Sequence, residues 1–260
     1  MNSRKISLLM VVAFLICNSA FTAAAVSGKN KVVVRGQAQD IYFFPGKGDG
    51  PHRRVLFAPG DGGWRGFAID VAKQLQAAGY DVYGFDTRHY LQSFADSGGL
   101  KTSDIAWDFR QIAEWMCQGS KGPVLLVGWS EGAGLSLAAA ADSKDKGVFQ
   151  GLVVFGMTEQ NILAWRWSDV WAEVAKKIPN EPTFPSSQFV GKVSPLPLFV
   201  IASSNDEYIS PQASLALMAD ARDPKKFVMI DAKDHKYGGN TDTFFRTLKE
   251  ALVWISQQRQ

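Results

Sequence analysis

Ser130 lies between two glycines directly after an apolar run, in the segment VLLVGWSEGAG of residues 124–134. A strand that ends in Gly-x-Ser-x-Gly and continues into helix formers is typical of a nucleophile elbow, a tight turn that lifts the serine hydroxyl above the edge of a sheet. Gly128 and Gly132 leave room for this turn, because a Cβ atom at either position would collide with neighbouring backbone. The same pattern also occurs in ordinary glycine-rich turns, so the rest of the chain must decide whether Ser130 is a nucleophile.

A serine hydroxyl becomes nucleophilic when a neighbouring base accepts its proton and an acidic group orients that base. In α/β hydrolases these groups follow the chain order Ser, Asp or Glu, then His. Of the three histidines only His235 follows Ser130, and it comes directly after the last strand-like run. Asp206 follows the preceding run and is the predicted acid, with its neighbour Glu207 as the alternative. Asp234 is disfavoured, because the side chains of adjacent residues seldom point at each other.

The third requirement is a pair of hydrogen-bond donors for the negative charge that develops on the substrate oxygen. One predicted donor is the backbone N–H of Glu131, the residue after the nucleophile. The other belongs to the glycine-rich loop APGDGGW of residues 58–64, where either Asp61 or Gly62 supplies the amide. Together these groups predict a serine ester hydrolase, which forms an acyl intermediate on its serine and requires neither a metal ion nor a cofactor.

The elements that must position these groups alternate along the chain. Predicted strands cover residues 31–36, 40–45, 53–60, 81–86, 122–129, 151–157, 196–203 and 225–232. Predicted helices cover residues 64–79, 102–117, 135–142 and 241–257. Continuous apolar strands favour a mostly parallel central sheet with helices on both faces, here the α/β-hydrolase fold with its first two strands antiparallel. The carboxyl ends of the parallel strands then meet at one edge, where ligands bind.

Two segments stand apart from this alternation. Residues 1–25 have a basic start, an apolar stretch and small residues before Ala25, and predict a secretory signal peptide cleaved near that residue. Residues 26–260 are then a single α/β-hydrolase domain, interrupted at about residues 157–195 by an insertion that is either a cap over the site or a surface excursion. The insertion contains three tryptophans, Trp165, Trp167 and Trp171. These side chains either meet lipid or pack beneath the insertion.

Charge and cysteine content narrow the range of partners and compartments. The formal net charge of +3 falls to +1 when Arg4 and Lys5 leave with the signal, which does not favour nucleic-acid binding. Cys117 then has no partner for an internal disulfide, and its place in a helical pattern predicts a structural role. The signal peptide predicts a periplasmic or secreted protein. Because such a protein would have no internal disulfide, it would depend on its apolar core for stability.

Several segments resemble the bacterial virulence-protein VirJ/AcvB domain family. They are PGDGGWRGFAIDVAKQLQAAGYDVYGFDTRHY, the elbow GWSEGAG, and FGMTEQNILAWRWSDVW, and the likeness spans most of residues 53–255. This resemblance implies a periplasmic branch of the α/β hydrolases, hydrolysis of aminoacyl-phosphatidylglycerol (chiefly the lysyl form), and an association with virulence and type IV secretion. The serine, aspartate and histidine of the family carry over onto Ser130, Asp206 and His235. On either side of Ser130 the family pattern has an aromatic and then an apolar residue, whereas this elbow has Trp129 and then Glu131, so it departs from the pattern at Glu131.

Three functions are consistent with these patterns. The first is an exported esterase acting on aminoacyl phospholipid, in which a carboxylate meets the lysyl ammonium. The candidate carboxylates near the site are Asp61, Asp86, Glu131, Glu159 and Glu207. The second is a non-catalytic protein that uses the hydrolase fold to assist secretion-system proteins. The third is a general esterase acting on a small-molecule ester.

Overall fold

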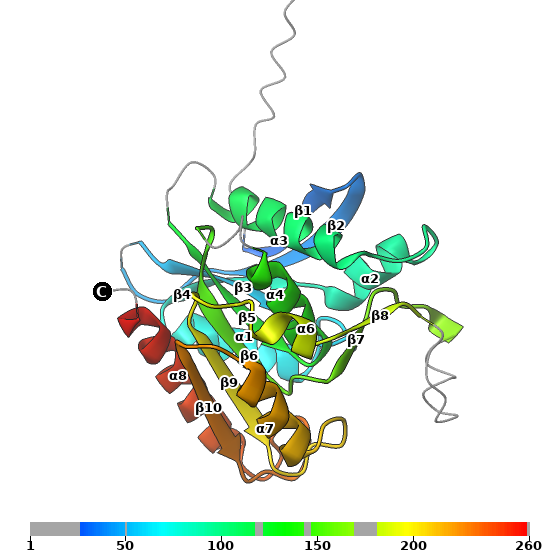
Figure 1. Cartoon of the computed structure of the whole chain (residues 1–260). Coiled ribbons are helices and arrows are strands. Elements are labelled where there is room, and N and C mark those ends of the chain that lie inside the picture. The colour runs from blue at the N-terminus through cyan, green and yellow to red at the C-terminus, as the bar shows by residue number, and fades with distance from the viewer. Residues whose placement is uncertain (1–26, 50, 118–121, 143–146, 169–180, 259–260) are drawn as a thin grey trace, which may run out of the picture.

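A central eight-stranded sheet organises the molecule, as seen in the computed structural model (Figure 1). The structure describes residues 27–49, 51–117, 122–142, 147–168 and 181–258, so the predicted signal peptide and Trp171 lie outside the described residues. The strands are β1 (Gly28–Val34), β2 (Gln37–Phe44), β3 (Arg53–Ala58), β4 (Tyr80–Phe85), β5 (Val124–Trp129), β6 (Phe149–Phe155), β9 (Leu198–Ser203) and β10 (Lys225–Ile230). Their order across the sheet is β1-β2-β4-β3-β5-β6-β9-β10. The predicted mostly parallel sheet is confirmed, since only β1 with β2 and β2 with β4 pair antiparallel.

The antiparallel start of the sheet is a two-residue hairpin. Arg35 and Gly36, between β1 and β2, both have positive φ, at 46° and 80°. This backbone matches the twist of a tight hairpin, and glycine adopts it without steric cost. The guanidinium of Arg35 then pairs with the buried carboxylate of Asp108, which ties the hairpin to the helix behind it.

Helices cover both faces of the sheet, as predicted (Figure 1). One apolar cluster lies between the sheet and the pair α1 (Phe67–Ala77) and α8 (Thr241–Gln257). The other face packs against α2 (Thr87–Ala95), α3 (Thr102–Cys117), α4 (Glu131–Ala141), α6 (Ser187–Val190) and α7 (Pro211–Asp220). No helix in the described ranges combines the length and the apolar character that a membrane crossing demands.

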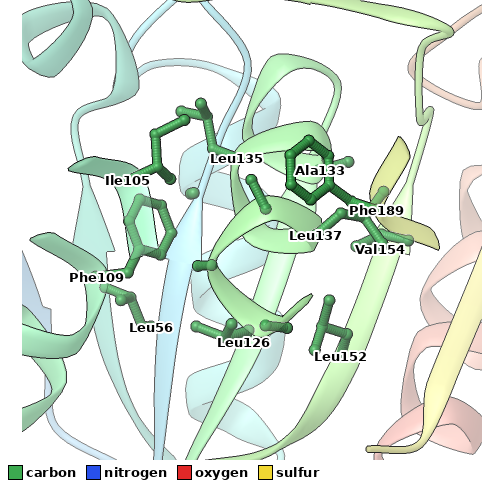
Figure 2. Close-up of a cluster of buried hydrophobic side chains, with 14 of the residues drawn as sticks. Leu56, Ile105, Phe109, Leu126, Ala133, Leu135, Leu137, Leu152, Val154 and Phe189 are labelled. Carbon is green, nitrogen blue, oxygen red and sulfur yellow. The ribbon is translucent and has the colours of Figure 1, made fainter. Parts of the chain in front are cut away.

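Helix α4 lies at the centre of the second cluster (Figure 2). Leu126 and Leu152 from the strands face Leu137 of α4, and Phe109 of α3 closes the cluster beside Leu56. All residues of α4 from its start to Ala140 are buried, and most are alanine or glycine. Small side chains let α4 approach the sheet closely, which fixes the start of this helix, and therefore Ser130, relative to β5.

Three of the described helices, α2, α6 and α7, were not anticipated from the sequence, although α2 and α7 each have a recognisable start. Asp86 caps α2, and its side chain accepts a hydrogen bond from the N–H of His89 at 3.1 Å. Ser210 caps α7 in the same way and is followed by Pro211 at the first helical position. Both are standard helix-start signals. The described part of the insertion forms the small antiparallel pair β7 (Gln160–Ile162) and β8 (Thr183–Pro185), followed by α6.

Candidate active site

Ser130 occupies a strained turn between β5 and α4. Its backbone has φ 55° and ψ −125°, a region that residues with side chains seldom adopt. The N–H of Ser130 donates to the carbonyl of Phe155 on the neighbouring strand at 3.0 Å, and its side chain makes no capping hydrogen bond to α4. The hydroxyl is therefore not used in helix capping, although it lies at the helix start.

Glycines make this turn possible. A Cβ atom on Gly132 would lie 2.0 Å from the carbonyl oxygen of Ala58, and one on Gly128 would lie 2.6 Å from the carbonyl oxygen of Gly132. Both distances are far below van der Waals contact with backbone atoms that cannot move away. Gly60 approaches from the opposite loop, where a Cβ would lie 3.0 Å from Cβ and 3.3 Å from Oγ of Ser130. The loop after β3 therefore packs directly on the elbow.

His235 and Asp206 form a buried pair. Asp206 follows β9, His235 follows β10, and Oδ2 of Asp206 lies 2.7 Å from Nδ1 of His235. Only 1% of the Asp206 side chain and 4% of the His235 side chain are exposed. A carboxylate on Nδ1 holds the proton on that nitrogen and leaves Nε2 as an acceptor. Nε2 of His235 is buried and has no hydrogen-bond partner among the described residues.

The other acidic candidates near the imidazole hold backbone instead. Oε2 of Glu207 accepts the backbone N–H of His235 at 2.8 Å, so Glu207 positions the histidine without touching its ring. Oδ1 of Asp234 accepts the N–H groups of Lys236 and Gly238, and these bonds lower the pKa of Asp234. Of the two acids proposed from the sequence, the structure brings Asp206 to the ring.

Ser130 and His235 both adjoin one short segment, the end of β6 and the residue that follows it, and among the described residues no hydrogen bond joins their side chains. The carbonyl of Phe155 accepts the N–H of Ser130, and Gly156 lies against the imidazole, where a Cβ would be 2.5 Å from Cε1 of His235. The ring of Trp129, the residue before the serine, lies 5.5 Å from the imidazole between centroids. The three side chains predicted as a triad thus come from separate loops at the same edge of the sheet.

The loop after β3 carries the candidate oxyanion donors. Gly63 N–H donates to the carbonyl of Gly60 at 3.0 Å, which makes Asp61 and Gly62 the central residues of a turn. Nε of Arg88 donates to the carbonyl of Asp61 at 2.8 Å. In a trans peptide the N–H points opposite to the C=O, so the N–H of Gly62 points away from Arg88. The N–H of Glu131, at the first position of α4, has no partner within the helix.

The side chain of Glu131 faces the insertion and not the nucleophile. It is buried, and Oε1 accepts the N–H of Ile162 in β7 at 2.9 Å. Burial raises the pKa of Glu131 well above its ordinary value, the nearby carboxyl of Asp61 raises it further, and the Ile162 N–H acts in the opposite direction. The unexpected carboxyl in the elbow is thus a structural link between α4 and β7.

A buried polar network strengthens the same link. The amide of Asn161 lies against Gly134 of α4, where a Cβ would be 1.9 Å from Oδ1 of Asn161. Nδ2 of Asn161 donates to Oγ of Ser186 at 2.9 Å, and that hydroxyl donates to the carbonyl of Thr158 at 2.6 Å. The described ends of the insertion are therefore anchored to the elbow helix.

Glu131→Gln is expected to increase the free energy of unfolding at neutral pH, because burial raises the pKa of the Glu131 carboxyl well above its ordinary value. The folded state retains a proton that the unfolded chain releases above its ordinary pKa of 4.5. Stability from this group is therefore fully present below pH 4.5 and is lost as the pH rises through the raised folded-state pKa. Glutamine carries no charge, and its oxygen can still accept the Ile162 N–H.

Denaturant unfolding at several pH values measures this effect. The advantage of the glutamine variant should disappear in acid, below the unfolded-state pKa. Glu250→Gln, at an exposed position of α8, is the matched control and should change the stability little. A pH dependence that is identical in wild type and Glu131→Gln would contradict a raised pKa of Glu131 in the folded protein.

Arg88, which sequence reasoning passed over, joins the loop after β3 to the insertion. Its guanidinium lies 4.2 Å from the ring centroid of Trp165 and 5.6 Å from that of Trp167, while its Nε holds the carbonyl of Asp61. Trp165 is buried, and Trp167 is 68% exposed. The signal that could have identified Arg88 is its place in the segment DTRHY, just after β4 at the carboxyl edge of the sheet. Within the described ranges, no three His, Cys, Asp or Glu side chains gather in a way that could hold a metal ion.

Comparison with known proteins identifies a family segment and the fold of this chain. Residues 53–162 match the family model VirJ, bacterial virulence protein. The resemblance predicted from the sequence is confirmed over this VirJ segment, which carries Ser130 and the loop with Asp61, whereas Asp206 and His235 follow it. An uncharacterized Mycobacterium tuberculosis protein, Rv2307c, is 24% identical over 197 residues, which are 75% of this chain and 66% of the relative's length.

Solved structures establish the fold around the VirJ segment. Est1E from Butyrivibrio proteoclasticus superposes with a TM-score of 0.66 at 13% identity, covering 89% of this chain and 100% of its own. The α/β hydrolase GrgF from Penicillium sp. sh18 gives a TM-score of 0.66 at 12% identity, covering 89% and 98%. Monoglyceride lipase from Saccharomyces cerevisiae gives 0.62 at 14% identity, covering 92% and 98%. The chain has the α/β-hydrolase fold.

Proposed function

We propose that this protein is a serine ester hydrolase of the exported compartment, and that its substrate is an aminoacyl-phosphatidylglycerol such as the lysyl form. The observation that carries the proposal is the oriented imidazole: Nδ1 of His235 is held by Asp206, and Nε2 is buried and unpaired among the described residues, beside the segment that binds Ser130. The substrate class is what the family resemblance seen in the sequence implies, and the VirJ match supports that resemblance. The signal-like residues 1–25 support a periplasmic or secreted location.

In the first step, Oγ of Ser130 attacks the ester carbonyl carbon while Nε2 of His235 accepts its proton. Asp206 stabilises the imidazolium, and the amide of Glu131, with that of Asp61 or Gly62, stabilises the oxyanion. Collapse of the tetrahedral intermediate breaks the bond to the glycerol oxygen, which takes the proton from Nε2. The aminoacyl group is then an ester of Ser130.

In the second step, a water molecule loses a proton to Nε2 of His235 and attacks the acyl carbon. Collapse of this second intermediate returns the proton to Oγ of Ser130 and releases the free amino acid. All the required groups belong to the protein, so the reaction needs no metal ion or cofactor. The exposed Trp167 supports an extension of the proposal to contact with the membrane surface that carries the lipid.

Release of lysine from vesicles that contain lysyl-phosphatidylglycerol tests this function. Purified protein should release free lysine and leave phosphatidylglycerol, and a fluorophosphonate probe should label Ser130. Labelling without lysine release, together with cleavage of simple esters, would assign a general esterase. A protein that neither cleaves esters nor reacts with the probe would instead be the non-catalytic, secretion-assisting protein.

A further inference from the structure

The loop that carries the candidate oxyanion donors also carries a carboxyl group, that of Asp61. An aminoacyl ester differs from a fatty-acyl ester in having an ammonium group one carbon from the scissile carbonyl. When that carbonyl oxygen sits on the amides of this loop, the α-ammonium is held close to the side chain of the same loop. The ε-ammonium of lysine, at the far end of its side chain, is not constrained in this way.

The other acids of this edge of the sheet are committed elsewhere. The carboxylate of Asp86 caps α2, that of Glu207 holds the N–H of His235, and that of Asp206 holds its ring. The carboxyl of Glu131 binds β7. Glu159 is exposed at the start of the insertion. Asp61 is the candidate carboxyl on the loop that packs directly against Ser130, next to Gly60.

The position of Asp61 is fixed on both sides. Gly60 before it lies against Oγ of Ser130, and the carbonyl of Asp61 itself is bound by Nε of Arg88. Burial raises the pKa of the Asp61 carboxyl, while the charge of Arg88, the backbone N–H of Gly62, the charge of His235 and the N–H of Asp61 itself lower it. The carboxyl therefore lies over the amides of its own loop, within electrostatic reach of Arg88 and His235. A carboxylate with little water around it binds an ammonium more strongly than an exposed one does.

We propose that the carboxylate of Asp61 binds the α-ammonium group of the substrate and makes the enzyme selective for esters of amino acids with a free α-amino group. The inference rests on the proposed function and deepens it, because it names the part of the aminoacyl group that is recognised. Recognition by the loop after β3 then depends on the α-ammonium group and not on the side chain of the amino acid, so this contact does not require lysine.

Three matched methyl esters test the inference: lysine, Nα-acetyl-lysine and norleucine. Nα-acetylation removes the α-ammonium, and norleucine lacks the ε-ammonium but keeps the α-ammonium. Wild type should prefer the lysine ester to its acetylated form in kcat/KM. Asp61→Asn should reduce this preference about 10- to 100-fold, as expected for loss of a charge-assisted hydrogen bond, and should affect the norleucine and lysine esters alike. Asp61→Glu should restore part of the preference.

Asp70→Asn, at an exposed position of α1, makes the same charge change and is the control. It should leave the preference for the lysine ester over its acetylated form unaltered. Thermal melting and the rate of Ser130 labelling verify that each variant is folded. An unaltered preference in Asp61→Asn overturns the inference, as does a loss confined to the lysine ester, which would assign Asp61 to the ε-ammonium. A wild type that cleaves all three esters without preference overturns the inference but leaves the hydrolase intact. Failure to cleave any ester or to label Ser130 overturns both proposals.

Discussion

Ser130→Ala is expected to lower lysine release from lysyl-phosphatidylglycerol by about 10⁴-fold or more. Without Oγ no acyl intermediate can form, and only binding and the oxyanion donors still assist the attack of water. The substitution should leave the fold intact, because the hydroxyl makes no capping bond to α4 and the methyl group occupies the same space. Labelling by a fluorophosphonate should disappear together with hydrolysis.

Steady-state lysine release and thermal melting, measured on the same samples, check this result. Ser256→Ala at the far end of α8 is the matched serine control and should retain both activity and labelling. In cells that lack the protein, the wild-type copy should lower the aminoacyl lipid and the Ser130→Ala copy should not. Substantial lysine release by a folded Ser130→Ala protein would remove this serine from the mechanism.

Asp206→Asn is expected to lower kcat by about 10³- to 10⁴-fold with a small effect on KM. The amide oxygen of asparagine can still accept the N–H of Tyr208, which Asp206 accepts at 2.9 Å, so the loop should keep its shape. Its NH₂ group would then face Nδ1 of His235 and place the imidazole proton on Nε2. An Nε2 that carries a proton cannot accept one from Ser130.

Glu207→Gln tests whether Glu207, the alternative acid, contributes to catalysis as Asp206 does. Its amide oxygen can still accept the backbone N–H of His235, so kcat should fall less than about 10-fold. Burst kinetics with a chromogenic ester would locate the loss in Asp206→Asn at acylation. If Glu207→Gln loses as much activity as Asp206→Asn, the ring contact of Asp206 is not what activates the serine.

The sheet and the approximate site were accessible from the sequence because they depend on strong local patterns. Apolar runs define the parallel strands, and the chain order of Ser130, Asp206 and His235 follows from the order of those strands. Asp206 was the predicted acid with Glu207 as the alternative, and only the coordinates show that Asp206 contacts the ring while Glu207 binds backbone, because adjacent residues share a loop and differ in side-chain direction. Helix α2 was missed although Asp86 caps it, because the segment is short and has few aliphatic side chains.

The roles of Glu131 and Arg88 could not be predicted because their partners are distant in sequence. Glu131 looked like a charge beside the nucleophile, whereas it is a buried acceptor for Ile162 in β7. Arg88 binds the carbonyl of Asp61 and stacks on Trp165, contacts that arise only when three loops meet. A residue's type gives its chemistry, but these two acquire their roles from tertiary neighbours.

The anchoring of β7 and β8 to α4 has an evolutionary consequence. Asn161, Ser186 and Glu131 hold the two roots of the insertion with directional bonds, so the roots cannot drift without disturbing the reactive hydroxyl. New sequence placed between those roots leaves these bonds in place, provided that it keeps Trp165, which packs on Arg88. Related enzymes could therefore diversify in the molecules they accept by exchanging this stretch alone, while the bond-breaking apparatus is inherited unchanged.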